Sequence, residues 1–229
     1  MDSVDRVDLE SSSAEKDLGV NVDTELKFSK HVETQVNKAN IILGLIRRSY
    51  EHLDAETLRL LFVALVRPHL EFANVVWSPR LEKDKNLIES VLRRATKCIP
   101  GVKTLSYEER LRVLKVPSMC YRRIRGDMIE AYKFVHGYYD CKNPLELNSL
   151  CNTRGHQFKL KKKQCRTALR QSFFTNRIID TWNSLDKNVV EAPTMNSFKN
   201  RLDNALKDYM YSPNVSMPLT TPAKKKLIE

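Results

Sequence analysis

Apolar side chains recur at three- and four-residue steps over most of this chain, and this spacing limits the folds that the chain can adopt. The first run follows Ser29, a residue type that caps helices, and continues to Arg48. Its apolar members are Val32, Val36, Ala39, Leu43 and Ile46. Because an α-helix has 3.6 residues per turn, such a run lies along one helix face. It therefore predicts an amphipathic helix of about five turns.

Further runs of this kind predict more helices, separated by caps and breakers. Asp54 is a second capping residue, and its helix should kink or stop at Pro68, which has no amide hydrogen. Ser106 and Glu109 fit a capping box, and Ser118 and Thr194 are capping candidates for later helices. The apolar members of these runs are Leu58, Leu61, Phe62 and Leu65; Leu87, Ile88, Val91, Leu92, Ala95 and Ile99; Ile124, Met128, Ala131 and Val135; Phe174, Ile178, Ile179, Trp182 and Leu185; and Phe198, Leu202, Ala205 and Tyr209.

Only short stretches have the alternating pattern of strands. Leu18, Val20 and Val22 alternate with polar residues near the N-terminus, and Phe158 and Leu160 alternate with lysines. The expected fold class is therefore mainly α, a helical bundle with a short N-terminal β-strand or hairpin and a small basic loop or strand segment. The expected segments are a hairpin over 1–26, a helical domain over 27–140, the basic segment over 141–171, C-terminal helices over 172–211 and a disordered tail over 212–229.

Positive charge is concentrated in one part of the chain. The 39 Lys and Arg exceed the 28 Asp and Glu by 11. Residues 1–35 hold nine acids and four bases, whereas residues 142–177 hold nine bases and the single acid Glu146. Such a surplus favours polyanions, either nucleic acid or an acidic membrane face. No stretch reaches the ~20 apolar residues of a membrane span, and the acidic N-terminus does not resemble a signal peptide. We expect an intracellular protein, the nucleus included, without a membrane partner.

The five cysteines are scattered rather than paired. An odd number without close spacing does not fit a secreted disulfide framework, so reduced thiols are expected. Cys141, Cys151, His156 and Cys165 carry suitable atoms for tetrahedral zinc, but their gaps of nine, four and eight residues fit no compact zinc knuckle. Unligated thiols and a loop histidine are the favoured interpretation, a zinc site remains an alternative, and no cofactor is expected.

The chain lacks the acids of a polymerase. Nucleotidyl transfer requires closely placed carboxylates that hold two divalent ions. The nearest match is the segment from Tyr138 to Cys141, in which cysteine stands where the second acid would be, and we interpret it as a helix end. No phosphate-binding glycine loop or paired-histidine metalloprotease helix occurs. The chain is therefore not expected to be an enzyme on its own.

Basic side chains in the second half of the chain are candidates for binding phosphates. They are Lys159, Lys161, Lys162, Lys163 and Arg166, followed by Arg170 and Arg177. If about four or five of them touched a duplex, log affinity would fall against log salt with a slope near −4. The alternative is a solvated strand face. Phe158, Phe173 and Phe174 flank the run and could stack on bases, although burial in the core is favoured.

A second basic group lies on the helix expected after Ser118. Arg122 and Arg125 share one helix face, whereas Arg123 lies about 100° away. Such a face can follow a nucleic-acid backbone. Solvated helix charge is the alternative interpretation.

Several separated segments resemble, in order, one protein family. Glu15 to Val20 and Leu26 to Val32 resemble the end of the reverse transcriptase domain in non-LTR, LINE-type retrotransposons of the jockey and chicken-repeat groups. Tyr50 to Trp77, followed by Ser78-Pro79, looks like the helical thumb of those enzymes. Segments that are similar to their C-terminal tail are Arg154-Gly155-His156, Phe173-Phe174, Trp182-Asn183-Ser184-Leu185 and Ser197-Phe198-Lys199. The resemblance covers about residues 15–209.

The resemblance implies a thumb that clasps the template–primer duplex and a palm-edge hairpin in which Leu18-Gly19 supports the primer end. It implies that the fingers, most of the palm, the metal-binding acids and any endonuclease domain would lie upstream of Met1. A hairpin severed from its sheet has an unpaired edge, so we expect the first ~25 residues to be frayed.

The expected function is binding of RNA, DNA or RNA–DNA hybrid without sequence preference, with a missing upstream polymerase portion as a further partner. The candidate binding residues are Leu18, Gly19, Arg122, Arg125, Lys159, Lys161, Lys162, Lys163, Arg166 and Arg170. No catalytic or metal residue is expected. The alternatives are a decayed fragment without a selected role and a helical protein-interaction module, whose partner would bind independently of salt.

Overall fold

The computed structural model describes residues 12–148 and 155–215, most of which are helical. This confirms the mainly α fold class with a short antiparallel hairpin at the N-terminus. The elements are β1 (Ala14–Asp17), β2 (Val20–Asp23), α1 (Ser29–Ser49), α2 (Ala55–Leu61), the π-helical η1 (Phe62–Val66), α3 (Arg67–Glu71), α4 (Asn74–Trp77), α5 (Glu82–Thr96), α6 (Tyr107–Leu114), α7 (Met119–Val135), α8 (Ala168–Ser172), α9 (Phe174–Arg177), α10 (Ile179–Ser184), α11 (Lys187–Val190), α12 (Met195–Ala205) and the 3₁₀-helical η2 (Lys207–Tyr209).

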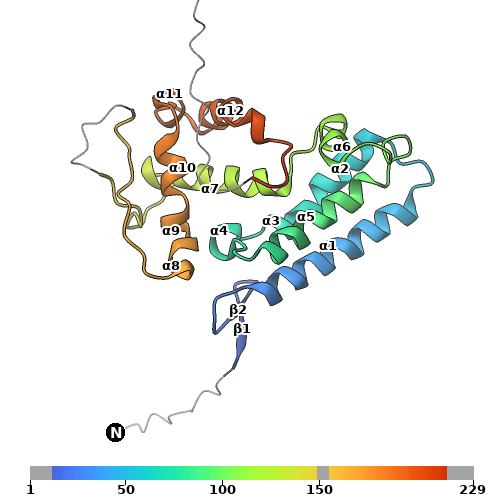
Figure 1. Ribbon diagram of the computed structural model, residues 1–229, viewed down its shortest axis with the longest axis horizontal. Helices are drawn as coiled ribbons and strands as arrows, with labels where there is room; N and C mark the ends of the chain where they lie inside the picture. The colour runs from blue at the N-terminus through green and yellow to red at the C-terminus, as the bar shows by residue number, and fades with distance from the viewer. Residues whose placement is uncertain (1–11, 149–154, 216–229) are drawn as a thin grey trace, which may run out of the picture.

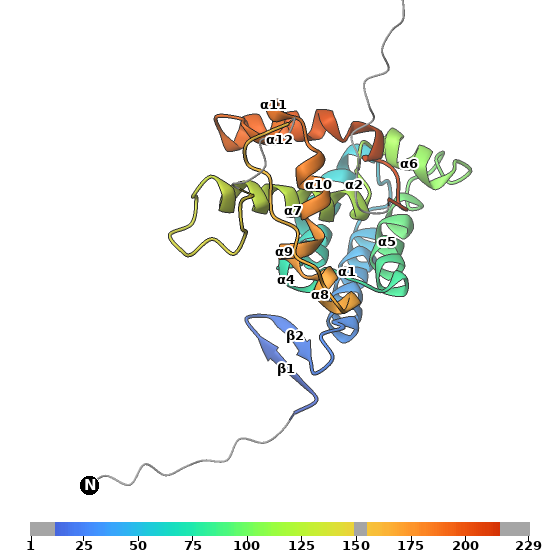
Figure 2. The same cartoon turned by 60° about the vertical axis from the view of Figure 1, so that its left-hand side comes forward.

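Two hydrophobic cores meet along α7 (Figure 1). The first core is built from β2 and α1 to α6 and extends to Met119. The second begins at Cys120 and contains the rest of α7 together with α9 to α12 (Figure 2). Although α7 lies inside the predicted 27–140 domain, its buried apolar side chains from Cys120 onward belong to the second core. Each core holds one fully buried tryptophan, Trp77 in the first and Trp182 in the second.

The N-terminal hairpin is docked on α1 rather than frayed over residues 12–26. β1 and β2 pair antiparallel, with Asp17 opposite Val20. Val20 is buried in the first core, and the Asn21 N–H donates to Nδ1 of His31 at 3.2 Å. Val20 and Val22 lie in β2, which confirms the predicted strand there, but Leu18 occupies the turn, with φ of 43° and 89% of its surface exposed. Residues 1–11 lie outside the described part of the chain.

The start of α1 is held by an aspartate that precedes it. Asp23 accepts backbone hydrogen bonds from Glu25, Lys27 and Phe28, the last at 2.7 Å. These bonds hold the pKa of Asp23 below its ordinary value against the opposing effect of burial. Ser29 was predicted as the cap, but Phe28 is the N-cap residue, and the Ser29 hydroxyl donates to Asp84 at 2.7 Å instead.

The helix does not stop at Pro68 but changes its hydrogen-bond pattern just before it. The Arg67 N–H bonds to the carbonyl of Phe62, five residues earlier, which is the π-helical pattern of η1. This wider turn accommodates a residue that has no N–H and whose ring would clash with the preceding turn. The chain therefore continues as α3, and Leu70 is buried there.

The other predicted caps are confirmed. Asp54 accepts from the amides of Glu56 and Thr57. Ser106 and Glu109 form the reciprocal capping box. Ser118 accepts from the Tyr121 amide, and Thr194 accepts from the Ser197 amide. A side-chain oxygen at each of these four positions satisfies an amide that has no partner within its helix.

The segment predicted as a tail begins as ordered chain along α7. The Ser118 hydroxyl donates to the carbonyl of Ser212 at 2.8 Å, and the Cys120 thiol donates to the carbonyl of Val215 at 3.4 Å. The disorder predicted from residue 212 therefore does not hold through 215, and residues 216–229 lie outside the described part. Within the described ranges, no helix has the length and apolar character needed to cross a bilayer.

Candidate nucleic-acid interface

The basic segment is anchored to the second core by its apolar residues. Leu160 is 2% exposed, and its N–H and C=O both bond to the side-chain amide of Asn183, at 2.8 and 2.9 Å. Leu160 also pairs with Leu147 in a single antiparallel bridge, so the predicted strand is reduced to one bridge. Side chains alternate sides in extended chain, which directs Lys161 toward solvent. Lys159 is half-buried, and its aliphatic stem lies over Gly155.

Three consecutive lysines follow this anchor and are more than half exposed. Lys163 Nζ lies 2.7 Å from a carboxylate oxygen of Glu146, and Lys161 Nζ lies 4.0 Å from the other. Lys162 Nζ lies 2.6 Å from Asp180. The hydrogen bond from Lys163 lowers the pKa of Glu146. Exposed pairs of this kind are weak because water screens them, so a phosphate can replace the carboxylate partner.

Two hollows adjoin these lysines. One, of about 300 Å³, is lined by Lys161 and Lys163 together with Arg170 and Phe173. The other, of about 660 Å³, is lined by Lys162, Lys163 and Arg177. The Arg170 guanidinium lies 5.3 Å from the centre of the Phe173 ring. The structure thus places the side chains of these lysines and of Arg170 around concave surface.

The flanking phenylalanines have different environments. Phe174 is buried in the second core, and Phe158 is half-buried against it, as the sequence favoured. Phe173 is 37% exposed beside Arg170. Arg166 is also exposed, in the loop before α8. Phe173 is therefore the member of this group that can present a ring face to a base.

Arg122 and Arg125 lie on one face of α7, as predicted, but that face is turned into the protein. Arg122 binds Glu71 through two hydrogen bonds of 2.8 Å, and this bidentate pair raises the pKa of Arg122. Arg125 binds Asp203 in the same bidentate way. The Tyr121 hydroxyl also donates to Asp203, at 2.8 Å. Neither arginine lines the hollows beside Lys161, Lys162 and Lys163.

Leu18 and Gly19 form the tip of the hairpin. Gly19 has a φ of 89°, and a Cβ at this position would lie 3.2 Å from Cε1 of Phe72. Glycine is therefore required by both the backbone conformation and the close approach of the ring. Leu18 and Phe72 are exposed, as is Val76 on α4, so the hairpin tip contributes apolar rather than basic surface.

The residues of the alternative zinc interpretation do not form a metal-binding group where the structure describes them. His156 is buried, and its Nε2 lies 3.2 Å from the carbonyl of Trp182. Burial lowers the pKa of His156. Cys141 is exposed, Cys165 is half-buried, and Cys151 lies outside the described residues. Within the described ranges, no three His, Cys, Asp or Glu side chains are arranged to hold a metal ion.

The segment that looks like part of a polymerase motif follows the end of α7. Tyr139 donates through its hydroxyl to Glu130, and Lys133 Nζ donates to the same hydroxyl at 3.2 Å. Asp140 is exposed. The Tyr139 ring therefore packs back on the helix.

Sequence reasoning missed the carboxylates that decide which bases remain available. Glu71, Asp127 and Asp203 pair with arginines 50 or more residues away in the sequence, so no local pattern reveals them. Glu146 was noted only as the single acid of the basic segment. The offset of Arg123 from Arg122 and Arg125 was the one available sign that α7 presents its arginines to different neighbours.

No protein-family model, curated protein or solved structure matches this chain.

Proposed function

We propose that this chain binds RNA, DNA or RNA–DNA hybrid without sequence preference, as the thumb and tail of a non-LTR retrotransposon reverse transcriptase. It carries no nucleotidyl-transfer chemistry of its own. One observation carries the proposal. Lys161, Lys162 and Lys163 are 52–66% exposed, pair within the described part of the chain with surface carboxylates, and border concave surface that also includes Arg170 and Phe173.

This arrangement suits a phosphate backbone. Lysines neutralise phosphates as point charges and release condensed counterions, which gives affinity without reading the bases. An exposed aromatic ring beside an arginine can add stacking that tolerates any base. The bidentate ion pairs of Arg122 and Arg125 leave these two arginines as supports for α7, so the proposed interface consists of Lys159 to Arg170 and Phe173.

The test is the salt dependence of hybrid binding, measured by fluorescence anisotropy with several labelled RNA–DNA duplexes of different sequence. For the wild type, log affinity should fall with log salt at a slope near −4, as about four contacts would give. Replacing Lys161, Lys162, Lys163 and Arg166 with Ala should flatten the slope and weaken binding equally for all sequences.

A matched variant separates this surface from general positive charge. Replacing Lys38, Lys83, Lys97 and Lys103 with Ala removes the same number of exposed cations from the surface around the first core. Its salt slope should stay close to that of the wild type. Equal losses in both variants would reduce the interface to net charge, and a wild type that ignores hybrid in dilute buffer would end the proposal. Extension of a primed template with magnesium would contradict the absence of catalysis.

A second candidate function rests on the apolar surface at the hairpin. Leu18, Phe72 and Val76 are 89%, 54% and 59% exposed. Large apolar side chains that are exposed together on one surface are typical of protein contacts. A helical protein-interaction module would bind its partner with little dependence on salt, and the four substitutions in the basic segment would leave that binding unchanged.

A further inference from the structure

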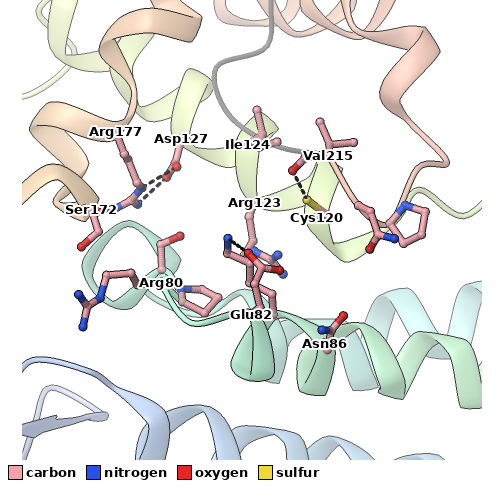
Figure 3. A pocket seen from close by; sticks show the side chains of 15 residues that line it. Arg80, Glu82, Asn86, Cys120, Arg123, Ile124, Asp127, Ser172, Arg177 and Val215 are labelled. Atoms are coloured by element: carbon pink, nitrogen blue, oxygen red, sulfur yellow. Dashed lines mark hydrogen bonds and ion pairs between the residues drawn. The ribbon is translucent and has the colours of Figure 1, made fainter. Parts of the chain in front are cut away.

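A cavity between the two cores is lined by more cations than carboxylates. Its volume is about 410 Å³, and it lies among the N-terminal turn of α5, the N-terminal half of α7 and the α8–α9 segment (Figure 3). Four cations line it, Arg80, Lys85, Arg123 and Arg177, and two carboxylates, Glu82 and Asp127. Lys85 pairs with Glu82 at 2.7 Å, and Arg177 pairs with Asp127 at 2.8 Å. Arg80 and Arg123 are the two cations left over.

Arg123 is the more deeply buried of the two. It is 6% exposed, and its Nη1 is buried without a hydrogen-bond partner among the described residues. Figure 3 shows it extending from α7 toward the Glu82 end of the cavity. A buried guanidinium nitrogen without a hydrogen bond is costly, because no group replaces the water that it loses. An anionic partner would remove that cost.

The carboxylates near Arg123 are already engaged. Glu89 and Asp127 are close enough to interact with Arg123 electrostatically. Glu89, however, accepts hydrogen bonds from the Tyr107 hydroxyl at 2.6 Å and from the amides of Met119 and Cys120. Asp127 is held by Arg177 through two bonds of 2.8 Å. Neither forms an ion pair with Arg123.

Two neighbouring features add donors to the same cavity. The first turn of α5 borders it through Glu82 and Lys85, and Leu81, the N-cap residue, has no side-chain oxygen to occupy the first amides. Helix N-termini carry partial positive charge and bind oxyanions. Arg80 lines the cavity as well, and its Nε is buried without a partner among the described residues. Ser78 and Ser172 supply hydroxyl groups to the lining.

We propose that this cavity binds a phosphate group, held by Arg123 and Arg80 at the N-terminal turn of α5. A tetrahedral oxyanion accepts several hydrogen bonds at once, and arginine forks match its geometry. The site is separate from the basic segment, because Lys161, Lys162 and Lys163 line other hollows.

The direct test is calorimetric titration of the full chain with inorganic phosphate, with chloride adjusted to keep ionic strength constant. The wild type should show one saturable site, and Arg123→Gln should weaken it about tenfold or more, since a charge-assisted bond is lost. Arg112→Gln is the matched control, because Arg112 is exposed and pairs with Glu108 on α6. Absence of a saturable site, or equal affinity in wild type and Arg123→Gln, would overturn the proposal.

A second variant keeps the test decisive if Arg123→Gln fails to fold. Glu82 lines the cavity with a side chain that is 78% exposed, so Glu82→Gln is compatible with the fold. Removing this negative charge should tighten phosphate binding, whereas Arg80→Gln should weaken it. Glu82→Gln that binds phosphate no better than the wild type would contradict a phosphate site at this end of α5.

The phosphate group can come from a free phosphate compound or from a nucleic-acid backbone. To distinguish these sources, the effect of Arg123→Gln is also measured on binding of a hybrid duplex without terminal phosphates. If Arg123→Gln weakens binding of inorganic phosphate alone, the site takes a free phosphate group. If it weakens hybrid binding as well, the site takes a backbone phosphate, and the surface around α5 joins the interface. A variant that changes neither affinity would refute the site.

Discussion

The arginines of α7 and the lysines of the basic segment carry the same charge but have different surroundings. Arg122 and Arg125 are 21% and 17% exposed, and each holds a carboxylate from a distant helix through two hydrogen bonds. Lys162 and Lys163 are 66% and 52% exposed, and each meets one surface carboxylate. The difference separates cations that hold helices together from cations that remain available to a ligand.

Side-chain chemistry explains why each residue type occupies its place. The planar guanidinium forms two parallel bonds to a carboxylate, which fixes the relative position of two helices. The lysine ammonium is a hydrated point charge on a flexible stem and gains little from a single exposed partner. Arg177 extends the first pattern, because it joins Asp127 on α7 to the carbonyl of Val75 on α4, across the two cores.

The largest effect is expected from removing the carboxylate of this central pair. Asp127→Ala would leave the Arg177 charge buried without its partner, which should lower the free energy of unfolding by about 3–5 kcal/mol. Urea denaturation measures the loss. Asp180→Ala, which removes an exposed partner of Lys162, should cost less than about 1 kcal/mol. Equal losses in the two variants would erase the distinction between the two regions.

An intermediate effect is expected at the Arg125–Asp203 pair. Arg125→Ala should lower the free energy of unfolding at neutral pH by about 1–3 kcal/mol, because a charged hydrogen-bond pair is broken. Burial raises the pKa of Asp203, but the bonds from Arg125 and Tyr121 outweigh burial, so the pKa lies below its ordinary value of 3.8.

This direction fixes the pH dependence. A carboxylate whose pKa is lowered by folding contributes stability above its unfolded pKa, and the contribution disappears as pH falls through the folded pKa. The difference in unfolding free energy between wild type and Arg125→Ala should therefore be full above about pH 4 and shrink at lower pH. Asp203→Asn should remove that dependence, and a difference that persists unchanged at low pH would show that the pair is not its source.

The smallest effect on stability is expected in the basic segment. Lys162→Ala should change the free energy of unfolding by less than about 0.5 kcal/mol, because an exposed ion pair contributes little. The same substitution should reduce the salt slope of hybrid binding by about 1. Comparison of urea denaturation with binding on one protein sample gives both values. A large loss of stability would place Lys162 with the structural arginines instead.

Local sequence signals predicted much of the fold. Asp54, Ser106, Ser118 and Thr194 cap the helices that they were expected to cap, because a capping oxygen acts on amides two or three residues away. Apolar periodicity likewise predicted the α1 face that carries Val32 to Ile46, now buried in the first core. The signal failed at Ser29, since Asp23 and a left-handed Phe28 occupy that helix start.

By itself, the sequence determined the mainly helical class, the starts of α2, α6, α7 and α12, and the position of the basic run, because those features depend on residues within one or two turns of each other. Tertiary structure alone decided which cations stay exposed. It brought Glu71 and Asp203 to Arg122 and Arg125, and it left Arg123 without a carboxylate of its own inside a cavity. The physical reason is that a charge acquires its role from the partners within a few ångströms, and chain folding brings those partners from distant parts of the sequence.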